Sequence, residues 1–323
     1  MSASVMQQRI DTEVSPDDRI VPFAVEALDV RGRLVRLGPA LNTILMQHAY
    51  PEPVARAVGE AVVMTALLGS ALKLDGRFQL QTRTSGAIDM IVVDFDTPDR
   101  LRAFARFDQA RLAEAQTPAG LIGTGHMAFT IEPEGGARYQ GVTALEGLGL
   151  EAAAHQYFRQ SEQIPTFVRL AVAQQITAMG SRWRAGGLLI QFLPSSPERQ
   201  RLRDIDPGDA PPGRLRDGGR DDEAWVEARA LAATVEDHEL VDPALASETL
   251  LYRLFHESGV TAFKPQDVSE ACRCSADRIE AMLRNFSPQE RTDMIGANGR
   301  IGVTCEFCSV QREFDPAEFE AVE

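Results

Sequence analysis

The chain has 323 residues, with 33 basic and 47 acidic side chains and a formal net charge of −14. So acidic a surface argues against a general nucleic-acid binder, which needs cations to neutralise phosphates, and against an anionic membrane surface as a partner. The hydrophobic fraction of 44% is ordinary for a globular protein, and the length favours two domains over one.

Residues 1–19 are polar and acidic and lack the apolar centre of a secretory signal. The longest apolar run, Ala61 to Leu72, is too short to span a bilayer. We therefore expect a cytoplasmic protein that does not bind membranes.

The first 194 residues predict one mixed α+β domain. Residues 23–30 and 33–37 suggest a hairpin turning at Arg31-Gly32, and Pro53 opens an apolar helix over residues 54–74. Alternating or β-rich segments predict the remaining strands at 77–83, 88–95, 101–107, 127–132, 139–143, 167–174 and 187–193, with a helix at 151–160.

Composition changes after Pro194. Residues 203–222 are rich in charge, proline and glycine, which is typical of a mobile linker. Two helices are predicted after it, Glu223–Glu236 and Pro243–Glu257, with Asp242 as N-cap and Pro243 at the first position of the second. The division we expect is a core domain at 1–194, an insert with linker helices at 195–263 and a C-terminal domain at 264–323.

All four cysteines lie in that last segment, as Cys272-Arg-Cys274 and Cys305-Glu-Phe-Cys308. Two short chelating loops in a reducing compartment favour a shared zinc site over structural disulfides. Between them, Ser275 is a candidate helix cap, Ser287 to Glu290 has the capping-box pattern, and Asn298-Gly299 signals a hairpin turn. Spacing alone leaves three alternatives open: a permanent structural zinc, a regulated metal site, or a thiol oxidoreductase, although the βαβ context of the last is missing.

Three motifs resemble the redox-regulated chaperones of the 33-kDa heat-shock protein family. They are the C-terminal CRCS…VTCEFC…EFD, the segment SEQIPT at 161–166 and the segment AGGLLIQFLP at 185–194. The order of core domain, linker and cysteine module agrees. The insert at 203–222 is longer than the family pattern, and residues 309–313 after the last cysteine differ from it.

The resemblance implies a holdase chaperone that uses no ATP and is not an enzyme. One Zn²⁺ would be bound by Cys272, Cys274, Cys305 and Cys308 in the reduced state. Four cysteines allow three disulfide pairings; the resemblance, with sequence proximity, implies Cys272–Cys274 and Cys305–Cys308 on oxidation. Zinc release would then expose apolar surface to unfolding or oxidatively damaged clients, with a shift from monomer to homodimer.

Candidate client-binding side chains are the apolar residues of the two linker helices, which at rest would be core contacts: Trp225, Val226, Leu231, Val235, Leu250, Leu251, Leu254 and Phe255. The competing hypothesis is a zinc-module binding factor for a protein or, less in keeping with its acidity, for nucleic acid. The five histidines are dispersed, without metal-ligand spacing, so we interpret them as helix-face or core residues.

Overall fold

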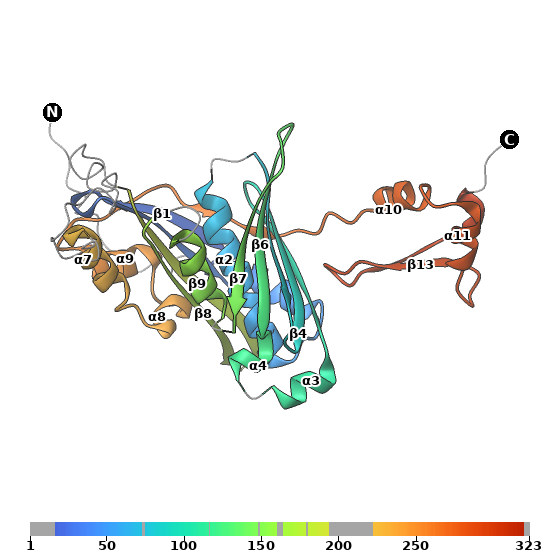
Figure 1. The fold of residues 1–323 in the computed structure, drawn as a ribbon, viewed down its shortest axis with the longest axis horizontal. Coiled ribbons are helices and arrows are strands. Elements are labelled where there is room, and N and C mark those ends of the chain that lie inside the picture. Colours follow the sequence, from blue (N-terminus) through green and yellow to red (C-terminus); the bar gives the residue numbers. More distant parts are fainter. Residues whose placement is uncertain are drawn as a thin grey trace, which may run out of the picture.

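The computed structural model describes residues 17–72, 75–115, 117–147, 149–159, 164–178, 180–193 and 222–319. Helices and strands are interspersed along the described chain, so the fold is mixed α+β, as predicted. Figure 1 shows its layers. Several of the sequence features discussed above lie partly outside the described residues: residues 1–16 of the polar N-terminal segment, 73–74 and 160 at the ends of two predicted helices, 161–163 of SEQIPT, Pro194 of AGGLLIQFLP, and 195–221 with most of the insert.

Two six-stranded sheets form the body. The first runs β10-β1-β2-β9-β8, with β11 also on β1: Thr261–Ala262, Arg19–Val25, Val30–Leu37, Gly180–Phe192, Thr166–Thr177 and Gln266–Asp267. The second runs β12-β5-β4-β3-β6-β7: Ser269–Glu270, Arg100–Phe107, Ile88–Asp96, Gly76–Thr84, Thr124–Pro133 and Tyr139–Glu146. The short strands β10 to β12 bring the chain after the linker back to both sheets.

The helix α2, Glu52–Ala71, lies between the two sheets and contacts strands of each (Figure 1). Shorter helices complete the body: α1 Pro39–Met46, α3 Gln109–Glu114, α4 Pro118–Ile122 and α5 Leu150–Tyr157. Of these, α1 packs against α2, and α5 packs on β7 and β8. Its length and composition alone would let α2 cross a membrane, because it begins nine residues before the apolar run at Ala61; 78% of its most apolar stretch, however, is buried inside the protein. It is the main core helix.

The first hairpin does not turn at Arg31-Gly32, so that prediction is wrong. The chain turns earlier, through the 3-10 helix Glu26–Leu28 and Asp29 in the left-handed region at φ 51°. Gly32 lies inside β2, where a Cβ would meet the ring of Phe23 at 2.2 Å. The glycine makes room for an aromatic ring rather than for a turn.

Three linker helices cover the outer face of the first sheet: α7 Glu223–Ala232, α8 Asp237–Val241 and α9 Ser247–Phe255. The sequence predicted two. A Glu236–Glu239 capping box starts the extra helix α8, and Asp242 accepts a hydrogen bond from Ala244 N beyond it instead of capping α9. Asp222, the last residue of the predicted insert, is the N-cap of α7.

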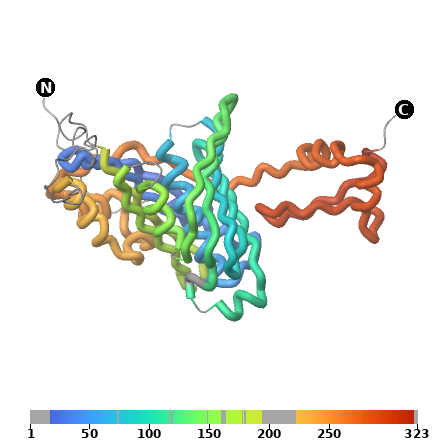
Figure 2. The backbone as a smooth tube through the Cα atoms, in the orientation of Figure 1, coloured from blue at the N-terminus to red at the C-terminus, as the bar shows by residue number. Residues whose placement is uncertain are grey.

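The C-terminal module projects from the second sheet (Figures 1 and 2). It contains α10 Ala276–Leu283, α11 Pro288–Asp293, the antiparallel pair β13 Ile301–Thr304 and β14 Gln311–Phe314, and the 3-10 helix η4 Pro316–Phe319. The Ser275 cap and the Ser287–Glu290 capping box are confirmed. At Asn298-Gly299 the chain does reverse, but the turn is flanked by a single antiparallel bridge between Ile295 and Ile301. The two-stranded sheet forms later, with the second cysteine pair in the loop between its strands.

Candidate metal centre

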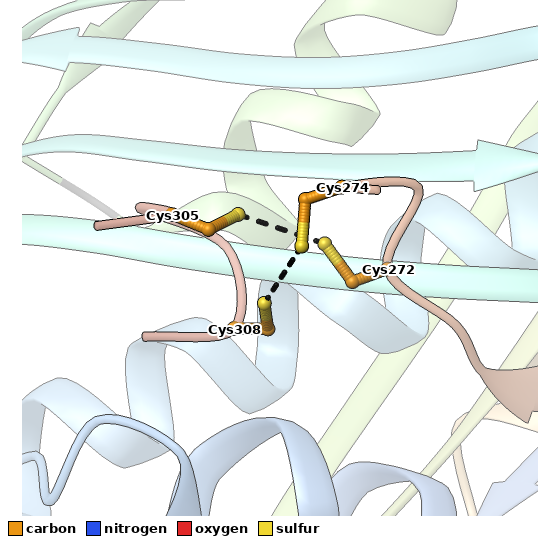
Figure 3. A group of neighbouring side chains, drawn as sticks. All are labelled: Cys272, Cys274, Cys305 and Cys308. Atoms are coloured by element: carbon orange, nitrogen blue, oxygen red, sulfur yellow. Dashed lines mark hydrogen bonds between the residues drawn. The ribbon is translucent and has the colours of Figure 1, made fainter. Parts of the chain in front are cut away.

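The sulfur atoms of Cys272, Cys274, Cys305 and Cys308 all lie within 4.8 Å of one another. The Sγ atoms of Cys272 and Cys305 are 3.6 Å apart and those of Cys274 and Cys308 are 3.3 Å apart, so each short contact joins the two pairs (Figure 3). Cys308 is buried and the other three are half-buried. Sulfurs that are far apart in sequence therefore converge on one point.

Local backbone structure aims each pair. Cys272 and Cys274 follow β12 after one residue, Ala271, and precede the Ser275 cap of α10. Cys305 and Cys308 lie in the loop that joins β13 to β14, where Cys305 N donates to Val310 O at 3.0 Å and Ser309 N donates to Cys305 O at 2.8 Å. This tight loop holds both of its sulfurs on the side that faces the first pair.

Proton affinities differ among the thiols. Burial raises the pKa of Cys274 and of Cys308. Burial also opposes ionisation of Cys272, but hydrogen bonds from the Cys274 backbone and from the neighbouring thiols outweigh it and lower the pKa of Cys272. A cluster of four thiols cannot carry four negative charges unless a cation compensates them.

The donor set fits a thiophilic divalent metal. Four sulfurs around a tetrahedral ion at about 2.3 Å would be about 3.8 Å apart, close to the contacts seen here. Within the described chain these four cysteines are the one group of potential ligands that converges in this way. All-sulfur tetrahedral coordination is typical of zinc and of iron–sulfur centres.

His48 is a neighbour of this centre that the sequence did not single out. Its Nε2 lies 3.0 Å from the carbonyl of Phe307, and its Nδ1 lies 3.0 Å from the hydroxyl of Ser309. Both contacts are to the loop between and after the second cysteine pair, so His48 holds the loop and not a metal. His48 and this loop are about 260 positions apart in the sequence, so no local sequence pattern could have predicted the contact.

Most of the predicted client-binding residues are buried between the linker helices and the first sheet. Seven of the eight pack in the cluster between the linker helices and the first sheet, with Leu231 only partly buried: Trp225, Leu231, Val235, Leu250, Leu251, Leu254 and Phe255. Val226 is 44% exposed, so its assignment to the buried side of α7 is wrong. It adjoins Trp225, and the buried side follows Ala224, Trp225, Ala228 and Ala232.

Two arginines of the first sheet hold the end of α8. Arg36 donates to the carbonyls of Glu239 (2.5 Å) and Asp242 (2.6 Å), and Arg184 donates to the carbonyl of Val241 (2.8 Å). Burial lowers the pKa of Arg36 to about 10, which leaves it charged at neutral pH. These charge-assisted bonds satisfy the carbonyls at the C-terminal end of the helix.

Comparison with known proteins agrees with this architecture. A family model described as Hsp33 protein matches residues 18–315. A 33 kDa chaperonin of Caulobacter vibrioides is 42% identical over 317 residues, covering 94% of this chain and 99% of the relative. One from Shewanella sediminis is 33% identical, covering 94% of this chain and 95% of the relative.

A solved structure shows the same fold. The crystal structure of the 33 kDa chaperonin (heat shock protein 33 homolog) from Thermotoga maritima superposes with a TM-score of 0.71 and 16% identity, over 94% of this chain and 96% of that one. With the family match spanning nearly the whole described chain, the conclusion is direct: this chain belongs to the Hsp33 family.

Proposed function

We propose that this chain is a cytoplasmic, ATP-independent holdase chaperone that is switched on by oxidation of its four cysteines. The observation that carries the proposal is the convergence of four sulfurs within 4.8 Å, at the base of a module that packs against the rest of the chain. Family membership, with relatives named 33 kDa chaperonin, supports the chaperone activity. The division at residues 194 and 263 is part of the same proposal.

In the reduced state, Cys272, Cys274, Cys305 and Cys308 would hold one Zn²⁺ as thiolates. When bound, the ion compensates the thiolate charges and ties the two loops together. The apolar core of the module is small, with five buried side chains: Ile279, Leu283, Ile301, Phe314 and Phe319. A module with so little core depends on the sulfur cluster for its order.

Oxidation would consume the sulfur ligands. Each pair of thiolates would lose two electrons to form one disulfide, while one peroxide would take up these electrons and two protons from solvent to give two waters. The zinc ion would be released as its ligands are consumed. We propose the pairs Cys272–Cys274 and Cys305–Cys308, on the strength of sequence proximity and family resemblance. The two shortest contacts join Cys272 to Cys305 and Cys274 to Cys308, but the sulfurs of each loop also lie within 4.8 Å of each other, so distance alone does not choose between the pairings. Peptide mapping of the oxidised chain by mass spectrometry decides between the pairings.

Disordering the module would then loosen the linker. The strand β12 ends two residues before Cys272 and pairs with β5, and β10 and β11 pair with β1. Loss of these short pairings would free the chain that anchors α7 to α9. The apolar side chains now packed beneath those helices would become available to unfolding proteins, and a homodimer would form from the reduced monomer.

One experiment tests the switch. The reduced protein is assayed for one equivalent of zinc, then treated with peroxide under mild warming while zinc release and light scattering by a heat-denatured test protein are followed together. Suppression of scattering that rises as zinc leaves, and reverses with a thiol reductant, is the expected result. Light scattering coupled to gel filtration reports the monomer–dimer shift.

The alternative is a zinc-module protein-binding factor whose zinc is purely structural. In that case zinc would survive oxidation and scattering would not change. The double variant Cys305→Ser/Cys308→Ser serves as the control, because it cannot form the second disulfide or a four-sulfur site. A chaperone response to peroxide in that variant equal to the native one would contradict the proposed switch.

A further inference from the structure

The outer face of the second sheet carries an apolar patch at strands β4 and β5. Alternate residues of β4 point inward to the core, so Met90 and Val92 point outward, where Phe104 of β5 joins them. All three are less than 10% exposed, and in the part of the chain that the structure describes their cluster includes no apolar side chain from a helix of the body. Gln81 of β3 lies beside Met90, with its Nε2 at 3.7 Å from the sulfur. The apolar side chain that packs on all of them comes from the C-terminal module.

The cover is Phe307, the residue between Glu306 and Cys308 in the second cysteine loop. Its ring meets that of Phe104 edge-on, with 4.8 Å between the two ring centroids. The guanidinium of Arg102, also on β5, lies over the Phe307 ring at 3.9 Å from its centroid. Phe307 packs with Met90, Val92 and Phe104 as one cluster. The ring is thus held by an apolar surface and a cation together.

Arg273 makes the matching contact from the first cysteine loop. Its Nε lies 3.0 Å from a carboxylate oxygen of Asp96, and its Nη2 lies 3.7 Å from Asp94, whose side chain is fully buried. Asp94 also accepts hydrogen bonds from Arg102 and Gln79. Arg77 of β3 also lies 3.5 Å from Asp94, so this buried acid is already paired within the sheet. The outer face therefore offers the carboxylate of Asp96 beside an apolar patch, and receives one basic and one aromatic side chain.

Both occupants lie between the cysteines of a pair. Arg273 and Phe307 are 34 residues apart and come from separate loops. The sulfur cluster holds these loops side by side, and the pairing of β12 with β5 and the contacts of His48 anchor each loop to the body as well. While the loops are joined, docking of one side chain keeps the other close to its site on the sheet. If the loops separate, Arg273 and Phe307 must bind independently, and each contact loses the raised effective concentration that the other gave it. Coverage of the patch is therefore coupled to the integrity of the sulfur cluster.

We propose that the outer face of β4 and β5 is a binding surface for unfolded protein segments carrying an aromatic side chain close to a basic one, which Phe307 and Arg273 occupy until the sulfur cluster opens. The inference rests on the proposed chaperone function and names a client surface on the opposite side of the body from the linker helices. Charge complementarity to Asp96, the acid that Arg273 now pairs with, and the ring site beside Phe104 define the partner.

Uncovering is tested without any client, by hydroxyl-radical footprinting of methionines with mass spectrometry on the zinc-loaded protein. Phe307→Ala should raise oxidation of Met90 several-fold while zinc stays at one equivalent, and Arg273→Gln should raise it in the same direction. Val310→Ala, a truncation of a 44% exposed side chain in the same loop, should leave it unchanged. Met64, fully buried in the core, reports unfolding. Continued protection of Met90 in both loop variants, or exposure only together with Met64, overturns the proposal.

Client binding is tested on protein oxidised with a thiol-specific reagent and freed of zinc. Met90→Glu places a charge in the patch, and Val142→Glu places the same charge at a 55% exposed site on β7 of the same sheet. Met90→Glu should need several-fold more protein than the native chain to halve the scattering of a heat-denatured test protein, whereas Val142→Glu should not. Equal protection by native and Met90→Glu chains overturns the surface; failure of the native chain itself to protect counts against the proposed function instead.

Discussion

Glu60 is a residue whose protonation state the fold alters. It lies on α2 beside a cavity of ≈ 670 Å³ that Arg56, Glu151 and His155 also line. Burial, with a contribution from the neighbouring carboxylates Glu151 and Asp237, raises the pKa of Glu60 to about 7 against the opposing effect of Arg56. The folded chain therefore binds a proton that the unfolded chain has released.

The sign of the pH dependence follows. Between the unfolded value of 4.5 and the folded value of about 7 the folded state binds more protons, so the stability contributed by this site falls as the pH rises. Glu60→Gln should leave stability unchanged near pH 5 and raise it near pH 8 by on the order of 1–2 kcal/mol. Urea unfolding of both chains at the two pH values measures this.

The matched control is Glu52→Gln on the same helix, where the carboxylate is exposed and pairs with Arg56. That change should be within about 0.5 kcal/mol of the native chain at both pH values. An equal fall in stability from pH 5 to pH 8 in the native and Glu60→Gln chains would mean that Glu60 ionises alike in the folded and unfolded states.

Two consecutive glycines set how closely the helices approach the first sheet. On β9, a Cβ at Gly186 would meet the carbonyl oxygen of Leu240 in α8 at 2.2 Å, and a Cβ at Gly187 would meet Val63 of α2 at 2.5 Å. The AGG motif thus serves one helix on each face of the strand. Without a side chain at Gly186, α8 could not lie where Arg36 and Arg184 reach its carbonyls.

Gly186→Ala should therefore loosen the linker helices. The added methyl group meets backbone rather than a flexible side chain, so docking of α8 should weaken by about 1–3 kcal/mol. Amide hydrogen exchange should accelerate in α7 to α9 and stay unchanged in β3 to β6. Gly302→Ala, where a Cβ would meet nothing within 4 Å, is the control. Native exchange rates in α8 of the Gly186→Ala chain would show that the close approach is not required.

What the sequence could and could not predict depends on the range of the interaction. The core helix, most strands of the body and the cysteine cluster were predictable because apolar periodicity and CxC and CxxC spacing are local signals. The start of α9 was not, since the capping box at Glu236 to Glu239 inserts a helix before it. Contacts such as Arg273 to Asp96 and His48 to Phe307 join distant segments, and no local pattern encodes them.

The layers of the whole molecule differ in how much apolar surface they bury, and therefore in stability. The linker helices cover the first sheet, α2 fills the space between the sheets, and the module rests on the second sheet through two cysteine loops (Figure 1). The body has two large apolar clusters, whereas the module has one small cluster of five buried side chains. Local unfolding begins where apolar contacts are fewest, which here is the module.

Metal removal should therefore unfold the molecule in parts. A strong chelator applied under reductant, which leaves the cysteines as thiols, should abolish amide protection in α10, β13 and β14 first. Protection in α2 and β9, at the centre of the body, should persist. Hydrogen exchange read by mass spectrometry, with zinc content measured in parallel, follows both regions in one sample.

Readdition of zinc should restore the module, because no disulfide has formed. Protection of β13 and β14 that survives complete zinc loss would show that five apolar side chains suffice to hold the module, and the sulfur cluster would then have no structural role to release.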